Sequence, residues 1–131
     1  MAAKTSPLSH IDPQAIFEDG VEVGPFCVIG PHVRIGTGTV LRNNVTIVGH
    51  TTIGCDNIFY PNCVIGEDPQ DVSYNGSPTR TQIGDRNCFR EGVTVHKGAE
   101  KEDHLTSIGN DGMFMANAHI AHNCKIGNHV I

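Results

Sequence analysis

The chain contains no tryptophan, few aromatic residues and no long hydrophobic run. Aromatic residues make up 5% and apolar residues 38% of its 131 residues. This composition suits a slim structure with an interior of Ile, Val and Leu better than a thick globular core. The apolar runs are only a few residues long, so no transmembrane segment is predicted. Residues 1–9 lack the apolar stretch of a secretory signal, so none is expected.

Positive charge and paired cysteines are also scarce. Nine Lys and Arg against fourteen Asp and Glu give a net charge of −5, which argues against a general nucleic-acid-binding surface. The five cysteines are an odd number without a Cys-x-x-Cys pair, so no disulfide framework is expected. We interpret Cys27, Cys63 and Cys124 as small core residues, because they share one position of the repeat described below. Free thiols indicate a reducing compartment, and we predict the cytoplasm.

What the sequence does contain is a six-residue repeat, in which every sixth residue is an apolar anchor. The anchors from residue 11 to residue 66 are Ile11, Phe17, Val23, Ile29, Ile35, Leu41, Ile47, Ile53, Phe59 and Ile65. Ten apolar residues in one register arise by chance with a probability on the order of 10⁻⁴. The period predicts an all-β parallel β-helix, in which one hexad makes a strand and a corner and three hexads make a coil. Glycine often follows the anchor, where it permits a positive φ or a close backbone approach.

Two segments interrupt this register. Asp71 and Ser77 stand where anchors are due, within a stretch rich in turn residues. A second stretch is rich in Lys, Glu and Asp. We predict two excursion loops, near 67–80 and 97–107, and loops on a repeat scaffold commonly carry function.

The sequence therefore predicts a polar lead-in at residues 1–10 and a β-helix domain at 11–131. Stacked repeats need capped ends, because an open coil presents unpaired strand edges. Ile131 closes a hexad without such a cap. We therefore expect a truncated chain that lacks further C-terminal coils.

Three of the eight histidines are predicted to converge on one strip of surface. The anchors Val95 and Ile120 should lie on the same face of successive coils, about 4.8 Å apart. His96 follows the first anchor, His122 lies two residues after the second, and His119 closes the preceding hexad. Such a cluster can supply a general base near neutral pH or hold zinc with a water as the fourth ligand. A row of surface histidines without a role is the third interpretation, and spacing alone leaves all three open.

The remaining polar features are less specific. We assign solvated or hydrogen-bonded structural roles to the other histidines, namely His10, His32, His50, His104 and His129. The window 80–101 holds five basic and three acidic residues, a local charge of +2 on an acidic protein. Ordinary scatter and a docking strip for a phosphate or an acidic partner both account for this charge.

Several runs resemble the UDP-N-acetylglucosamine acyltransferase family of lipid A synthesis. They are 83–87 (IGDRN), 90–96 (REGVTVH) and 117–124 (NAHIAHNC), with the shorter matches Gly66-Glu67, Gln70-Asp71 and Pro78-Thr79-Arg80. The resemblance extends over essentially all of residues 11–131. It implies a left-handed parallel β-helix, an exception to the usual right-handed crossover, and a homotrimer with active sites between subunits.

The resemblance also implies an activity without a cofactor. A 3-hydroxyacyl group would move from acyl carrier protein to the 3-hydroxyl of UDP-N-acetylglucosamine, the first step of lipid A synthesis. His122 matches the general base of the family, His96 and His119 match histidines that line the cleft, and Gln70 and Asp71 match substrate contacts. The base would take the hydroxyl proton as the oxygen attacks the thioester, while backbone amides stabilise the oxyanion.

The chain departs from this family at two positions and in length. Asn123 follows the base where the family usually has Asp. Asp could orient the imidazole and favour its charged form, whereas Asn can only orient it. Ser73 stands where a Lys is usual, and the C-terminal coils and helical domain of the family are absent. Three alternatives stay open: a sugar N-acyltransferase, favoured by the His-Asn pair; a trimeric zinc enzyme of the γ-carbonic-anhydrase type; and an inactive scaffold.

Overall fold

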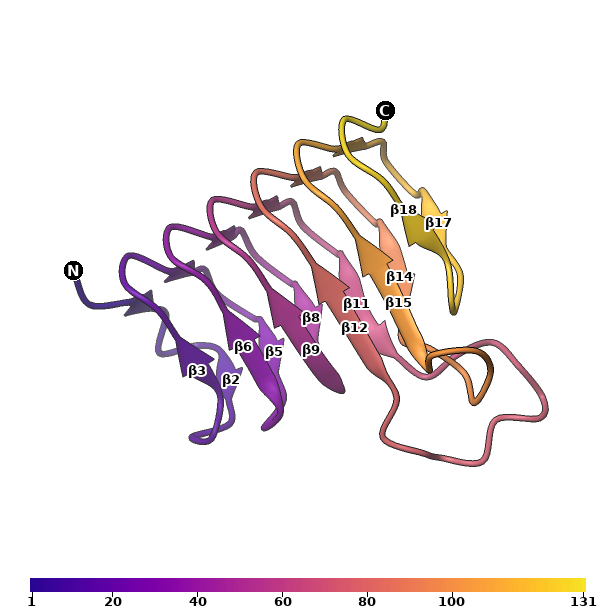
Figure 1. Ribbon diagram of the computed structural model, residues 1–131. Coiled ribbons are helices and arrows are strands. Elements are labelled where there is room, and N and C mark those ends of the chain that lie inside the picture. The colour runs from indigo at the N-terminus through magenta and orange to yellow at the C-terminus, as the bar shows by residue number, and fades with distance from the viewer.

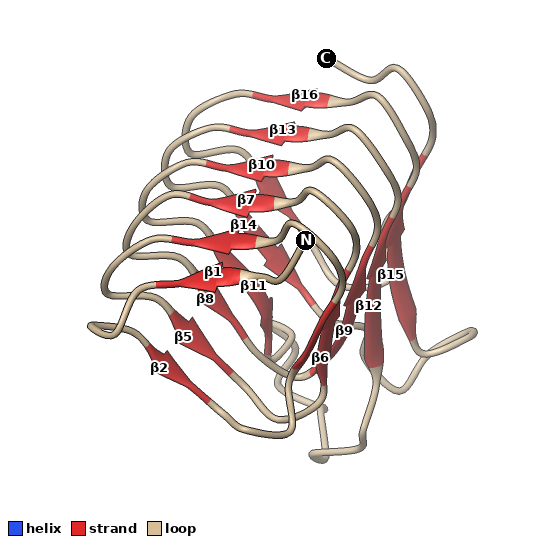
Figure 2. Cartoon of the chain, turned by 90° about the vertical axis from the view of Figure 1, so that its left-hand side faces the viewer, coloured by secondary structure: helices blue, strands red, loops and turns tan.

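The computed structural model describes residues 1–131 and consists of short strands joined by corners, without helices. The strands form three parallel sheets of six strands each, and these sheets are the sides of a three-sided prism (Figures 1 and 2). Each strand pairs with the strand three places away in the chain, so three successive strands make one coil. The predicted left-handed parallel β-helix of hexapeptide repeats is confirmed. No helix in the structure is long and apolar enough to cross a membrane.

The strands are two to four residues long, and every third strand belongs to the same sheet. The first sheet comprises β1 (Lys4–Thr5), β4 (Glu22–Val23), β7 (Val40–Leu41), β10 (Ile58–Phe59), β13 (Cys88–Phe89) and β16 (Met113–Phe114). The second comprises β2 (His10–Ile11), β5 (Val28–Ile29), β8 (Thr46–Ile47), β11 (Val64–Glu67), β14 (Thr94–His96) and β17 (His119–Ile120). The third comprises β3 (Ile16–Phe17), β6 (Val33–Ile35), β9 (His50–Ile53), β12 (Arg80–Ile83), β15 (Leu105–Ile108) and β18 (Lys125–Ile126).

The anchors fill the interior of the prism, as the repeat predicts. They are buried in every coil from Val23 to Ile120. Phe59, Phe89 and Phe114 come from successive coils and stack with ring centroids 4.6 and 4.9 Å apart. Such offset aromatic contacts add stabilisation beyond burial alone. The cysteines at the small inward position are buried or partly buried, and all five cysteines are free.

The glycines that follow an anchor serve both of the predicted roles. Close approach applies at Gly24, because a Cβ there would lie 1.8 Å from the Arg42 carbonyl oxygen of the next coil, and positive φ applies at Gly66, with a φ of 87°. The repeat did not predict that positive φ recurs at the third residue after most anchors, as at Asn44, Asn62 and Asn123. Asn tolerates this left-handed conformation better than most residues with a side chain.

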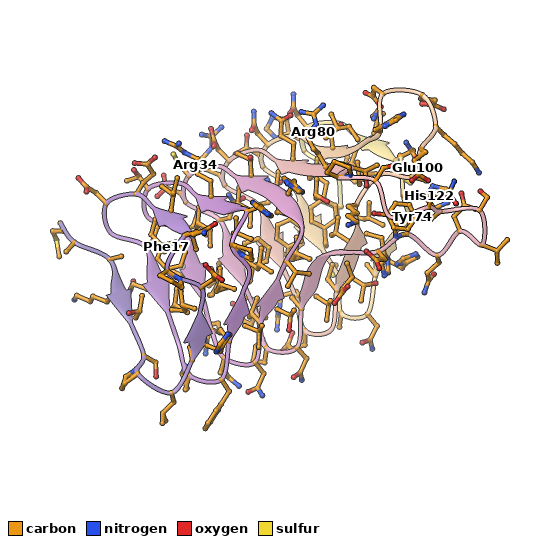
Figure 3. The ribbon with its side chains drawn as sticks, turned by 90° about the horizontal axis from the view of Figure 1, so that it is seen from below. Phe17, Arg34, Tyr74, Arg80, Glu100 and His122 are labelled. Atoms are coloured by element: carbon orange, nitrogen blue, oxygen red, sulfur yellow. The ribbon has the colours of Figure 1, made fainter.

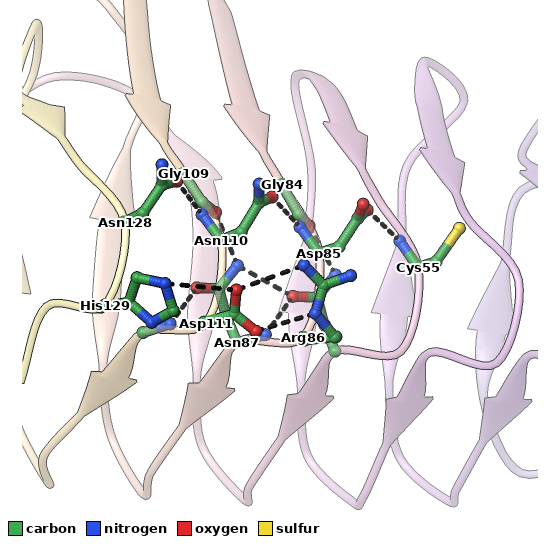
Figure 4. Close-up of polar contacts among 12 residues, drawn as sticks. Cys55, Gly84, Asp85, Arg86, Asn87, Gly109, Asn110, Asp111, Asn128 and His129 are labelled. Carbon is green, nitrogen blue, oxygen red and sulfur yellow. Dashed lines mark hydrogen bonds and ion pairs between the residues drawn. The ribbon is translucent and has the colours of Figure 1, made fainter.

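A ladder of side-chain oxygens along one corner ties successive coils together (Figure 4). The Cys55 N–H donates to Asp85 Oδ1 at 2.8 Å, and the Asp85 N–H donates to Asn110 Oδ1 at 2.7 Å. The Asn110 N–H in turn donates to Asn128 Oδ1 at 2.8 Å. Each of these residues stands two places after an anchor, so the ladder fixes the register of neighbouring coils.

The two predicted excursions are present, at residues 68–79 between β11 and β12 and at 97–104 between β14 and β15. Both leave the prism at the corner between the second and third sheets (Figure 1). They therefore lie beside the histidines at that corner.

Candidate functional site

The site lies at this corner, on the last two coils. His96 ends β14, His119 begins β17 and His122 lies in the corner that follows β17. Val95 pairs with Ile120, as the anchor spacing predicts, and Thr94 pairs with His119. The sheet register therefore determines which histidines meet.

His96 and His119 form a close pair. Their ring centroids are 4.9 Å apart, with an angle of 67° between the planes. His119 Nδ1 lies 2.8 Å from the Thr94 hydroxyl on the neighbouring strand. Nδ1 of His96 is buried and has no hydrogen-bond partner. Burial lowers the pKa of His96 first, and His119 and His122 lower it further, against the opposing effect of Glu67. Burial and the neighbouring histidines thus favour the neutral form of the His96 ring.

Asn123 fixes the orientation and the tautomer of His122. Its Oδ1 accepts the Ala99 N–H at 2.9 Å, and its Nδ2 donates to the Lys101 carbonyl at 3.0 Å. These two contacts set the orientation of the amide, because a flipped group would place donor against donor. His122 Nδ1 lies 2.9 Å from the same Oδ1, so Nδ1 carries the hydrogen. In the neutral ring, Nε2 then holds the free lone pair and is the basic atom.

The backbone explains why an Asn can stand beside His122. Asn123 is the third residue after the anchor Ile120 and has a φ of 63°. Its N–H donates to the Thr106 hydroxyl at 2.9 Å. One residue therefore makes the corner and also holds the imidazole.

The first excursion supplies a carboxylate that is already paired. Asp71 Oδ2 lies 2.9 Å from Lys101 Nζ, and the Asp71 side chain is 9% exposed. Its Oδ1 accepts the N–H of Ser73 at 2.9 Å and the hydroxyl of Ser73 at 2.7 Å. Lys101, followed by Ser73, holds the pKa of Asp71 well below its usual range. The neighbouring Gln70 is exposed and makes no hydrogen bond to the rest of the chain through its side chain.

Lys101 connects the carboxylate to the histidine. Its ammonium pairs with Asp71, and its backbone carbonyl accepts a hydrogen bond from Asn123, which orients His122. The structure thus joins Asp71 and His122 through the second excursion. Sequence reasoning missed this connection, because a loop has no period from which contacts can be derived. The contact between Thr94 and His119, in contrast, follows from the register and could have been found.

The second excursion also holds the first in place. Lys97 Nζ lies 3.1 Å from Asp68 Oδ1 and 5.3 Å from the centre of the Tyr74 ring. The Glu100 carboxylate accepts backbone N–H groups of residues 75 and 77 at 3.0 and 3.1 Å. Figure 3 shows Tyr74, Glu100 and His122 together at the end of the molecule where the excursions emerge.

The surroundings of the histidines within one chain show which ring atoms are engaged. No group of three or more His, Cys, Asp or Glu side chains is arranged to hold a metal ion. The Nδ1 atoms of His119 and His122 face Thr94 and Asn123. A half-buried imidazole with a fixed tautomer and a free Nε2 is instead the arrangement that a general base needs.

The known proteins that this chain resembles are transferases. The family model for the bacterial transferase hexapeptide (six repeats) matches residues 14–49. The chain is 43% identical over 125 residues to an acyl-[acyl-carrier-protein]–UDP-N-acetylglucosamine O-acyltransferase of Saccharophagus degradans, covering 95% of this chain and 48% of that protein.

Two solved structures are similar over nearly the whole chain. LpxA from Acinetobacter baumannii superposes with a TM-score of 0.94 at 40% identity, covering 95% of this chain and 48% of that one. UDP-N-acetylglucosamine O-acyltransferase (LpxA) from Moraxella catarrhalis superposes with a TM-score of 0.92 at 42% identity, covering 94% and 48%. The chain spans about half the length of the relatives it matches.

Proposed function

We propose that this chain, a homologue of the UDP-N-acetylglucosamine O-acyltransferases over nearly its whole length, carries the acyl-transfer site of such an enzyme. It moves a 3-hydroxyacyl group from acyl carrier protein to the 3-hydroxyl of UDP-N-acetylglucosamine, the first step of lipid A synthesis. The observation that carries the proposal is the hydrogen bond from His122 Nδ1 to Asn123 Oδ1, which leaves Nε2 as the base.

In this mechanism His122 first accepts a proton from the sugar hydroxyl and later donates it to the leaving thiolate. Nε2 takes the proton of the sugar hydroxyl as the oxygen attacks the thioester carbon. The imidazolium stays hydrogen-bonded to Asn123, and backbone amides stabilise the oxyanion. The intermediate then collapses, the carbon–sulfur bond breaks and the thiolate takes the proton from the imidazolium. His96 and His119 line the same cleft, and Gln70 and Asp71 contact substrate.

We further propose a cytoplasmic homotrimer. The histidines lie on the outer surface of one prism, with only the two excursions beside them, so a neighbouring subunit is needed to enclose the substrates. Five free cysteines suit a reducing compartment. Light scattering measures the assembly, and a monomer at micromolar concentration would contradict it.

The decisive test is the replacement of His122 in the full-length parent protein. His122→Ala should lower kcat by at least about 10²-fold, the usual contribution of a general base, with little change in melting temperature. His96→Ala should act mainly on KM. His129→Ala is the matched control, because this exposed corner histidine lies outside the site.

The assay also distinguishes the alternatives. Acceptors with a hydroxyl or an amine at position 3 distinguish O-acyl from N-acyl transfer, and an inactive scaffold turns over neither. Near-parental turnover by His122→Ala, or its failure to fold, would show that this histidine is structural.

A further inference from the structure

A polar hollow lies on the third sheet, away from the acyl-transfer histidines. Arg80 pairs with His50 across neighbouring strands, and His32 precedes Val33, the partner of Thr51. The column His32, His50, Arg80 therefore rises through three successive coils. The imidazoles of His32 and His50 stack in parallel, with centroids 4.2 Å apart and 5° between their planes. The hollow has a volume of about 400 Å³, and its other lining residues are Thr52, Thr81, Gln82 and Leu105.

The hollow contains hydrogen-bond donors and positive charge but no anion. None of its lining residues is acidic, and the Arg80 guanidinium has no carboxylate partner. The other outward arginine of this sheet, Arg34, differs because it pairs with Glu18 at 2.6 Å. Figure 3 shows Arg34 and Arg80 along the same side of the prism. Arg80 is therefore the arginine of this sheet that is free to bind a ligand.

The surroundings of His50 also contain positive charge without a neighbouring anion. Its basic neighbours are His32 from the corner before β6, Arg80 from β12 and Lys97 from the second excursion. Asp68 balances the charge of Lys97 at 3.1 Å. Burial, then His32 and Lys97, lower the pKa of His50. Two imidazoles in face-to-face contact cannot both be cations at low cost unless an anion lies beside them.

We propose that the hollow formed by His32, His50 and Arg80 binds a phosphate group. The planar guanidinium offers paired N–H donors that match a phosphate, and the imidazole N–H groups with the Thr52 hydroxyl and the Gln82 amide supply further donors. The hollow lies two to four coils from His122, from about 10 Å for Arg80 to about 19 Å for His32 along the axis at 4.8 Å per coil. It does not depend on the proposed acyl transfer.

Binding should be coupled to protonation of the histidine pair. A bound anion stabilises the imidazolium form, so complex formation takes up protons and affinity rises as the pH falls through the range in which histidine titrates. The charges of Arg80 and Lys97 do not change over that range, but inorganic phosphate itself loses a proton in it. The contribution of the two imidazoles is therefore measured with UDP-N-acetylglucosamine, whose pyrophosphate diester keeps its charge, and its binding should be stronger at pH 6 than at pH 8.

The experiment follows the imidazole carbon-bound protons by NMR while inorganic phosphate is added to the purified protein. We expect saturable shifts of His32 and His50 and no shift of the exposed His10. Arg80→Gln should weaken binding at least about 10-fold, the loss expected for a charge-assisted hydrogen bond. Arg34→Gln is the matched control and should bind as the parent does.

A second arm replaces inorganic phosphate with UDP-N-acetylglucosamine. Tighter binding at the same resonances identifies the substrate as the source of the phosphate, and weaker binding identifies the free ion; both outcomes support the site. Absence of saturable shifts from both ligands would overturn the proposal, as would unchanged affinity in a folded Arg80→Gln protein. If Arg80→Gln fails to fold, His50→Gln is used instead. The shifts of His32 then report the affinity for phosphate, which should again be weaker than in the parent protein.

Discussion

Replacing Asn123 separates the two tasks of this residue, making the corner and holding the imidazole. Asn123→Gly permits the φ of 63° but removes the amide, so the His122 ring loses its fixed orientation and tautomer. We expect kcat to fall about 10- to 100-fold, because a hydrogen bond to a group that becomes charged contributes about 1.5–3 kcal/mol. KM should change little, since the amide contacts protein rather than substrate.

The loss of stability follows from the same contacts. The glycine variant loses the bonds to Lys101 and His122, and it leaves the N–H of Ala99, a residue that is 1% exposed, without an acceptor. At about 1 kcal/mol for each lost bond and about 1–3 kcal/mol for an orphaned buried donor, unfolding becomes easier by about 3–5 kcal/mol. Asn123→Ala should be about 1 kcal/mol less stable still, because alanine is strained at positive φ. This order reverses the usual preference for alanine over glycine.

Asn123→Asp tests how a negative charge beside His122 affects the protonation of its imidazole. The carboxylate keeps an acceptor for Ala99 and His122 but turns its second oxygen toward the Lys101 carbonyl, so stability should fall by about 1–3 kcal/mol. A carboxylate favours the imidazolium, so the acid limb of the pH–kcat profile should move to higher pH.

Acyl-transfer kinetics across the titration range of histidine and thermal unfolding measure these effects in all three variants. If Asn123→Gly retains parental kcat while its melting temperature falls, the amide has only a structural role and the argument for the base is refuted.

Two further predictions concern the coils and the excursions. Gly24→Ala should destabilise the protein by about 3 kcal/mol or more, because its Cβ would overlap the Arg42 carbonyl oxygen and push two coils apart. Gly30→Ala, where the nearest atom is 3.5 Å away, is the matched control, and equal melting temperatures for the two variants would contradict the close-approach argument. Lys101→Met should remove the partner that depresses the pKa of Asp71. The stability advantage of the parent should be complete above about pH 4, the unfolded pKa of Asp, and should shrink as the pH falls toward the lower folded value; a difference independent of pH in denaturant unfolding would contradict it.

The periodic part of the molecule could be predicted from the sequence, and the loops could not. The anchors fix which residues face inward and which coils meet, so the pairing of Val95 with Ile120 and the approach of His96 to His119 are confirmed. The contacts of Lys101 depend on a non-repeating backbone, and no spacing encodes them. The catalytic role of His122 stays a prediction.

The amide of Asn123 shows the same division within one residue. Its ability to orient the imidazole was predicted from chemistry. Its tautomer assignment needed the Ala99 N–H and the Lys101 carbonyl, both from the second excursion. The positive φ at Asn123 was not predicted, because the repeat gives the position of a corner but not the dihedral angles within it.

The three-sided repeat restricts how the length of this chain can change. Each hexad turns the chain through about a third of a revolution, so strands are equivalent only after a full coil. Glu22 pairs with Val40, and 40 − 22 gives a coil of 18 residues. Loss of one hexad between β9 and β12 would rotate every later coil out of phase and carry Arg80 away from His50, while the contacts among His96, His119 and His122 would rotate together intact. Loss of a whole coil would restore the phase and shift the later coils along the axis by one step. Insertions and deletions in the coils are therefore tolerated in units of complete turns.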